Sequence, residues 1–278
     1  MSFERLEIAA SPCPNDVFIL SGLIEKKVEL PFEITLKLTD IETLNTLALK
    51  REYPLIKASF TIYPLICEDY EILSCGSALG FGVGPILISR EDFNLKEDED
   101  FTGKRVALPG KYTTANFLYE LFFNGNGEKV FLFYHQIIPA LLEKRVDLGV
   151  LIHEGRFVYK KYGFKLISDL GELWEKKTGA PLPLGGFFIK RELPKEIKKE
   201  VLQALRKSLE YAWKHKEEIY PLLKKYSQEL DREVIFRHIE TYVNKFTFRL
   251  EDEALSSLQI FMNLVGLKED IQKYLWDI

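Results

Sequence analysis

Short apolar runs recur through the first two thirds of the chain and predict strands. They are Leu6–Ala9, Ile34–Leu38, Leu55–Ala58, Ile72–Ser74, Gly84–Ser89, Arg105–Leu108, Val130–Phe133 and Leu148–Ile152. Segments with helical spacing lie between them, such as Pro14–Ile24 and those that carry Ile41, Leu44 and Ala48, or Ile137, Ile138, Leu141 and Leu142. Because strands that alternate with helices form βαβ units, an α/β fold with mainly parallel sheets is predicted.

The pattern changes after about Leu193, where helical spacing replaces the alternation. Val201, Leu205, Leu209 and Ala212 follow one another at steps of four, four and three in a stretch rich in Lys and Glu. Asp231 is placed to cap the start of another helix, and a last helical stretch holds Leu255, Leu258, Phe261 and Met262. The tail is therefore predicted to be entirely helical.

Two interruptions divide the α/β part. The acidic segment Glu91–Phe101 is typical of a surface loop, but a fresh βα pattern begins at Lys104, which also fits a hinge crossing. Pro and Gly cluster at Pro181–Phe188 before a short apolar strand. Hinges near 90–103 and 181–190 predict a discontinuous first lobe, 1–95 plus 188–278, that carries the helical tail, and a second α/β lobe, 96–187.

Composition narrows the class of protein. The chain has 278 residues, of which 46% are hydrophobic and 29% charged, values ordinary for a globular protein. Its 38 basic and 42 acidic residues leave a net charge of −4, which disfavours a dedicated nucleic-acid binder. No long apolar run or basic leader is present, so we expect a cytoplasmic protein with no membrane partner. The oligomeric state is not predictable from these features.

The cysteines do not form a recognisable metal or disulfide pattern. They are Cys13, Cys67 and Cys75, an odd number without CxxC spacing. A disulfide framework or a structural zinc site is therefore not expected, and a reducing compartment fits.

Hydroxyl side chains follow several predicted strands. Thr113 and Thr114 come after Gly110-Lys111-Tyr112, which lacks the spacing of a nucleotide-phosphate loop but could hold an anion such as a carboxylate at a helix start. A simple helix cap also explains one of these threonines. Ser59, Thr61 and Ser77 follow other strands, and open α/β sheets bind ligands at the carboxyl ends of their strands. Gly80-Phe-Gly82-Val-Gly84 is not a dinucleotide motif, so NAD is not expected.

One histidine stands at a strand end. His153 follows the apolar run Leu148–Ile152, and histidine titrates near neutral pH, as a general base requires. Capping of the following helix is the simpler alternative. His215 and His238 lie in predicted helices and are expected to be structural. The loop Ser11–Asp16 precedes a helix, where Asn15 and Asp16 are ordinary capping residues and Cys13 is expected to pack in the interior.

Several of these segments together resemble the 1,4-dihydroxy-6-naphthoate synthase family of menaquinone biosynthesis by the futalosine route. SPCPNDVF at Ser11–Phe18, GSALGFGVGP at Gly76–Pro85, LPLGG at Leu182–Gly186 and HEGRF at His153–Phe157 carry the resemblance. The sequence departs mildly from the family, with Val17 and Val158 where Thr is usual.

The resemblance implies a two-lobed fold like that of type II periplasmic binding proteins, with a ligand cleft between the lobes. It also implies a lyase that converts cyclic dehypoxanthine futalosine to 1,4-dihydroxy-6-naphthoate without any cofactor or metal. By the same match His153 would be the general base. Substrate contacts, including those to a carboxylate, would fall to Asp16, Ser59, Thr61, Ser77, Thr113, Thr114 and Arg156. Glu154 and Arg156 could also pair to support the loop.

Two other functions remain open on the sequence. Chorismate dehydratase of the same pathway shares the fold, although the SPCPND and HEGRF segments speak against it. A non-catalytic cytoplasmic solute-binding protein is the third possibility, and a histidine at a strand end favours an enzyme over it.

Overall fold

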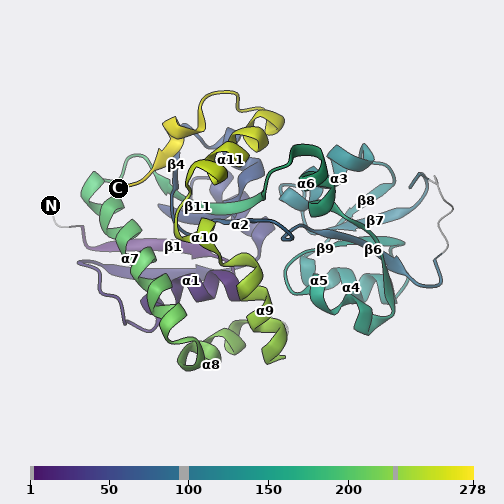
Figure 1. Cartoon of the computed structure of the whole chain (residues 1–278), viewed down its shortest axis with the longest axis horizontal. Coiled ribbons are helices and arrows are strands. Elements are labelled where there is room, and N and C mark those ends of the chain that lie inside the picture. The colour runs from purple at the N-terminus through teal and green to yellow at the C-terminus, as the bar shows by residue number, and fades with distance from the viewer. Residues whose placement is uncertain (1–2, 94–99, 228–230) are drawn as a thin grey trace. The chain divides into compact units, whose positions relative to one another are not determined.

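A computed structural model describes residues 3–93, 100–227 and 231–278. The chain folds into two compact units, each with its own sheet (Figure 1). The first unit contains residues 1–80 and 183–278, and the second contains residues 81–182. The first unit is therefore assembled from two segments that the second unit separates in sequence.

The sheet of the first unit is mixed. Its strands run in the order β12-β4-β11-β3-β1-β2, and β5 pairs with β11 outside this path. β1 pairs in parallel with β2 and β3, whereas β11 is antiparallel to β3 and β4. The strands are β1 (Arg5–Ala10), β2 (Glu33–Leu38), β3 (Leu55–Ser59), β4 (Tyr70–Leu73), β5 (Ala78–Gly80), β11 (Leu182–Lys190) and β12 (Leu275–Trp276).

The helices of the first unit come from both of its chain segments. They are α1 (Pro14–Ile24), α2 (Ile41–Leu49), α7 (Lys195–Lys214), α8 (Lys216–Tyr226), α9 (Arg232–Tyr242), α10 (Lys245–Phe248) and α11 (Asp252–Val265), with short 3₁₀ helices η1 (Phe60–Leu65) and η3 (Ile271–Tyr274). α1 packs against α7, α8 and α9. A polar contact joins α1 to α7, because the buried Ser208 hydroxyl on α7 donates to Ile19 O at 2.6 Å and accepts from Gly22 N at 2.9 Å. The C-terminal helices thus belong to the core of the first unit.

The second unit is a smaller α/β body around its own apolar core. Its sheet has the order β10-β6-β9-β7-β8, in which β7 is parallel to β8 and β9, and β6 is antiparallel to β9 and β10. The elements are β6 (Ile86–Arg90), β7 (Arg105–Leu108), α3 (Thr114–Phe123), β8 (Glu128–Phe131), α4 (Tyr134–Leu142), β9 (Leu148–Leu151), α5 (Gly155–Val158), η2 (Tyr159–Tyr162), β10 (Phe164–Asp169) and α6 (Leu170–Thr178).

The boundaries between the units differ from the predicted ones. The first falls between Gly80 and Phe81, well before the predicted break after residue 95, because β6 pairs with β9 and β10 of the second unit. The acidic segment Glu91–Phe101 therefore joins two strands of one unit; its residues 94–99 lie outside the described part of the chain. The second boundary falls between Leu182 and Pro183, whereas the predicted boundary came after residue 187.

Three predicted features need correction. The sheets are mixed rather than mainly parallel, because β6 and β11 enter their sheets antiparallel to neighbouring strands. β11 is also a long inner strand, although the sequence predicted a short one. The tail is not entirely helical, since β12 pairs in parallel with β4, as Leu275 with Ile72 and Trp276 with Leu73. A two-residue strand carries too little pattern to be predicted.

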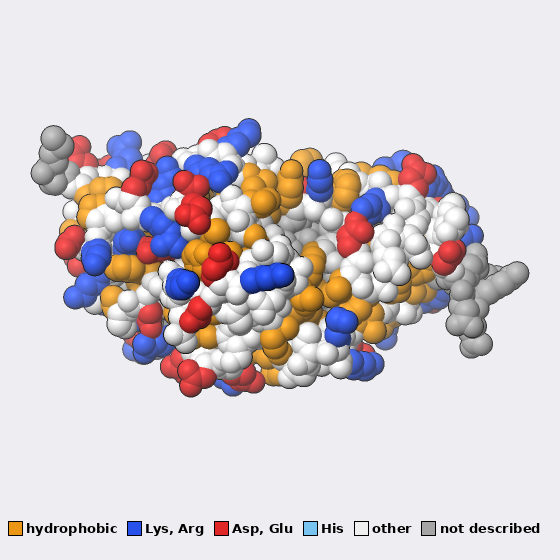
Figure 2. Space-filling view, turned by 90° about the horizontal axis from the view of Figure 1, so that it is seen from above, with side chains coloured by type: hydrophobic (Ala, Val, Ile, Leu, Met, Phe, Trp, Pro, Cys, Tyr) orange, Lys and Arg blue, Asp and Glu red, His pale blue; other side chains and the backbone are white. Residues whose placement is uncertain are grey.

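Charges of both signs are interspersed over the face shown in Figure 2, with apolar side chains between them. This agrees with the nearly equal totals of 38 basic and 42 acidic residues.

Within the described residues, no helix combines the length and the apolar character needed to cross a bilayer.

Candidate functional site

In the second unit, His153 lies directly beyond the carboxyl end of β9. Its φ of 53° places it in the left-handed region, which only a few per cent of residues other than Gly adopt, with Asn, Asp and His enriched among them. Its ring meets the ring of Tyr134 edge-on, with the centroids 4.9 Å apart. The N-cap of α5 is Glu154, not His153, so the simple capping alternative does not describe this histidine.

Glu154 is a buried carboxylate beside His153. It is 4% exposed, and one of its oxygens lies within 4.8 Å of a ring nitrogen of His153. Its side chain does not cap α5. The two side chains bring a nitrogen base and a carboxylate together, which is the composition of an acid–base site.

Arg156 is held inside the second unit. Its guanidinium donates to Gly84 O at 2.6 Å and to Asp169 Oδ2 at 3.1 Å, and its side chain is 12% exposed. Asp169 in turn caps α6 through Gly171 N and Glu172 N. Arg156 therefore pairs with Asp169 rather than with Glu154, and it ties the start of β6 to the start of α6.

The threonine loop lies at the same sheet edge as His153, because it follows β7, the parallel neighbour of β9. Thr113 is the N-cap of α3: its hydroxyl accepts from Asn116 N at 3.3 Å and donates to Gly110 O at 2.9 Å. The capping interpretation is thus confirmed for Thr113, whose proton is already donated. Thr114 is the first residue of α3 and is 4% exposed.

In the first unit, Ser59 ends β3 and is clamped by Asn45 of α2. Asn45 Oδ1 accepts from Ser59 N at 2.9 Å, and Asn45 Nδ2 donates to Ser59 Oγ at 3.1 Å. The hydroxyl of Ser59 therefore acts as an acceptor here and keeps its own proton. The helix that follows is η1, a six-residue 3₁₀ helix that contains Thr61, so Ser59 does not precede an α-helix.

Ser77 precedes β5 and is fully buried, with 0% exposure. Its hydroxyl has no hydrogen-bond partner within the described residues. It lies against β11, where a Cβ on Gly186 would be 3.0 Å from Ser77 Oγ. Because Gly186, the last residue of the LPLGG segment, has no side chain, it leaves space for this hydroxyl.

Asp16, in the first turn of α1, is engaged by the protein itself. Its carboxylate forms a salt bridge with Lys57 Nζ at 2.9 Å and accepts from Asn15 Nδ2 at 2.9 Å and from Ser11 N at 3.3 Å. Asp16 follows β1 and Ser59 ends β3; these strands are parallel neighbours, so both residues lie at one edge of the first sheet.

Sequence reasoning missed two residues of the first unit, Lys57 and Asn45. Lys57 lies inside the buried strand β3, and its sequence neighbours do not show which groups it contacts. Asn45 lies within the helix α2. Both depend on contacts between segments distant in sequence, and only an unusual position, a charge inside a strand that is otherwise apolar, could have pointed to Lys57.

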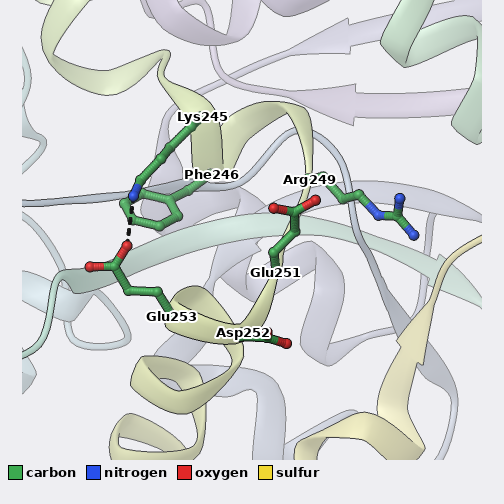
Figure 3. A pocket seen from close by; sticks show the side chains of 6 residues that line it. All are labelled: Lys245, Phe246, Arg249, Glu251, Asp252 and Glu253. Carbon is green, nitrogen blue, oxygen red and sulfur yellow. Dashed lines mark hydrogen bonds and ion pairs between the residues drawn. The ribbon is translucent and has the colours of Figure 1, made fainter.

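A pocket of about 230 Å³ lies away from all of these residues, around the start of α11 (Figure 3). Its walls carry charged side chains, including the ion pair of Lys245 Nζ with Glu253 Oε2 at 2.7 Å. No sequence-predicted site residue lines it. Its lining residues are Lys245, Phe246, Arg249, Glu251, Asp252 and Glu253.

Comparison with known proteins places the chain among biosynthetic enzymes. The profile of a family described as menaquinone biosynthesis matches residues 6–266. A 1,4-dihydroxy-6-naphtoate synthase of Thermus thermophilus is 40% identical over 251 residues, which span 90% of each chain. A protein of the same name from Streptomyces coelicolor is 36% identical over 264 residues, 93% of this chain and 92% of the relative.

Solved structures agree with the fold. The crystal structure of an Archaeoglobus fulgidus protein matches with a TM-score of 0.87 at 36% identity, covering 95% of this chain and 97% of that one. A Candida albicans protein described as having the generic periplasmic binding protein fold matches with a TM-score of 0.66 at 11% identity, covering 99% and 96%. The predicted periplasmic-binding-protein-like fold is confirmed.

Proposed function

The chain belongs to the menaquinone biosynthesis family, and from this membership we propose that it is a lyase that converts cyclic dehypoxanthine futalosine to 1,4-dihydroxy-6-naphthoate. The observation that carries the proposal is the position of His153 within HEGRF, at the carboxyl end of β9 and in a rare backbone conformation. Uncommon φ values persist where the surrounding structure requires them, and they cluster at active sites.

The proposed chemistry begins with a proton transfer. His153 abstracts a proton from the carbon next to a carbonyl of the substrate. The carbon skeleton then fragments, the sugar-derived piece departs, and aromatisation of the remaining rings drives the reaction. A positioned base of this kind contributes about 10²- to 10⁴-fold to the rate.

The hydrogen bonds of the described residues show which of the proposed substrate-binding side chains still have a proton to donate. Ser59 and Ser77 keep protons that they can donate to substrate oxygens, whereas the proton of Thr113 is directed to Gly110 O. We assign Thr61 and Thr114 to substrate contacts on the resemblance alone. Asp16 and Arg156 act through protein contacts, which hold the loops that bear the other residues.

The proposed ligand is a small carboxylate, and the proposed place of action is the cytoplasm, where the menaquinone precursor would be processed. We propose no nucleic-acid or membrane partner and no metal or organic cofactor.

Purified protein should be incubated separately with cyclic dehypoxanthine futalosine and with chorismate, and the products followed by chromatography and mass spectrometry. We expect 1,4-dihydroxy-6-naphthoate from the first substrate and no dehydration of the second. Turnover of chorismate would instead support the dehydratase. A saturable thermal shift with cyclic dehypoxanthine futalosine but no product would indicate a binding protein.

A further inference from the structure

A salt bridge is buried in the interior of the first unit. Lys57 Nζ on β3 lies 2.9 Å from Asp16 Oδ1 on α1, and their side chains are only 4% and 3% exposed. Taking two charges out of water is costly, and apolar residues of similar volume often stabilise a fold as well or better. Stability alone therefore does not explain why a lysine occupies this position.

A polar chain continues from Asp16 to α9. Asn15 Nδ2 donates to Asp16 Oδ1 at 2.9 Å, and His238 Nε2 lies 2.9 Å from Asn15 Oδ1. Because the Asn15 amide group donates with its nitrogen, its oxygen is an acceptor, and His238 Nε2 must carry a proton. These hydrogen bonds hold the Asp16 carboxylate in place, and the carboxylate in turn holds the ammonium group of Lys57.

Lys57 also reaches the loop that precedes β5. Its Nζ donates to Gly76 O at 2.6 Å, and Gly76 N donates to Thr247 O at 2.7 Å. Gly76 has a φ of +91°, and a Cβ there would lie 2.5 Å from the Phe187 ring. The position thus requires glycine, and both polar groups of its backbone are held.

The Gly76 carbonyl belongs to the same planar peptide group as the nitrogen of Ser77. The contact with Lys57 therefore sets the orientation of the peptide that leads into Ser77. The Ser77 hydroxyl is fully buried and lacks a hydrogen-bond partner in the described part of the chain. A buried hydroxyl in this state costs free energy unless something supplies a partner.

We propose that Lys57, held by Asp16, is a positioning residue that orients the Gly76–Ser77 peptide so that the Ser77 hydroxyl donates to an oxygen of the substrate. This inference rests on the proposed function and deepens it. Lys57 does not touch the substrate; it acts through Ser77.

The test compares two buried lysine–carboxylate pairs of the same unit. The double variant Lys57→Met/Asp16→Asn removes both charges of the proposed pair. The matched control, Lys198→Met/Glu71→Gln, removes a pair whose Nζ–Oε2 distance is 2.6 Å and whose side chains are 5% and 15% exposed. Thermal unfolding measures stability, and steady-state kinetics with cyclic dehypoxanthine futalosine measure KM and kcat. Wild-type turnover is measured first.

We expect the first double variant to raise KM roughly 10- to 100-fold, the range for loss of one hydrogen bond to a charged or polar oxygen. The control should keep KM within about two-fold at a similar loss of stability. Ser77→Ala should raise KM to a similar extent, and adding it to the first double variant should cause little further loss, because contacts in one network are not additive.

An unchanged KM in folded Lys57→Met/Asp16→Asn, or losses that multiply with Ser77→Ala, would overturn the positioning role. Asp16→Asn alone is the milder second variant, from which we expect a smaller rise in KM; a wild-type KM would contradict the inference. Failure of both variants to fold would assign the pair to stability and overturn the inference. Absence of wild-type turnover would remove the proposed function and this inference together, whereas the other outcomes bear on Lys57 alone.

Discussion

The left-handed backbone at His153 makes the choice of substitution important at the residue scale. With a φ of 53°, this position favours Asn over most other side chains, while Ala is strained there. We therefore expect His153→Ala to lower the free energy of unfolding by about 1 kcal/mol more than His153→Asn. Urea denaturation of the two variants measures this difference. Equal stabilities would show that the backbone strain at residue 153 is not significant.

Thr113 is expected to stabilise the fold rather than to select the substrate, because its hydroxyl both caps α3 and donates to Gly110 O. Thr113→Val should lower the free energy of unfolding by about 1 kcal/mol, the usual value of an N-cap. Thr113→Ser, which retains the hydroxyl, should lose much less. Chemical denaturation compares the variants, and a Thr113→Val protein of wild-type stability with a greatly raised KM would contradict this assignment.

At the element scale, the segment that precedes β6 contacts the start of α6 backbone to backbone, at Gly84 and Gly171. A Cβ on Gly84 would lie 2.2 Å from Gly171 Cα, so Gly84→Ala must push the two elements apart. We expect the free energy of unfolding to fall by about 1–3 kcal/mol. Gly82→Asn is the control, because Gly82 has a φ of +67°, which Asn tolerates, and a Cβ there would have no atom of the described residues within 4 Å. If both variants unfold alike, the close contact is not what requires Gly84.

The carboxylate of Asp277, the residue after β12, accepts hydrogen bonds from Ser74, Arg206 and Arg249 and so holds β12 in place. Burial raises the pKa of Asp277, but hydrogen bonds from Ser74, Arg206 and Arg249 outweigh burial, so the pKa lies below its ordinary value. A carboxyl whose pKa is lower in the folded state stabilises the fold above its unfolded pKa of about 4 and loses this effect as pH falls through the folded value.

Asp277→Asn should therefore lower stability at pH 6–7, and the difference from wild type should shrink below about pH 4. Denaturant unfolding across this pH range measures it. Glu33→Gln is a control that removes an exposed salt bridge with Arg5 and should have little effect at any pH. A difference between wild type and Asp277→Asn that stays constant down to about pH 2 would contradict the assigned shift.

At the scale of the whole molecule, periodicity predicted the elements well and their partners less well. Pro14–Ile24 and Arg105–Leu108 have the predicted bounds, and Asp231 caps α9 through Glu233 N and Val234 N, because these features depend on local spacing and capping. The boundary near Gly80 was placed too late, since the pairing of β6 with β9 and β10 is set by segments far along the chain.

The same distinction separates the predicted site residues. A motif indicates which residues matter, but not which atoms are already bonded. Thr113 and Arg156 proved to be engaged by Gly110 O, Gly84 O and Asp169, contacts that no spacing rule contains. Lys57 was missed for the same reason, because its partners Asp16 and Gly76 O lie far from it in sequence.

The most direct test of the central claim is the rate at which wild type and His153→Asn form 1,4-dihydroxy-6-naphthoate from cyclic dehypoxanthine futalosine, with both proteins verified as folded. Asn suits the backbone at residue 153 but cannot accept a proton as a base. We predict that the wild type forms the product and that His153→Asn loses at least about 10²-fold in kcat. A His153→Asn protein that turns over at the wild-type rate would contradict the assignment of His153 as the base.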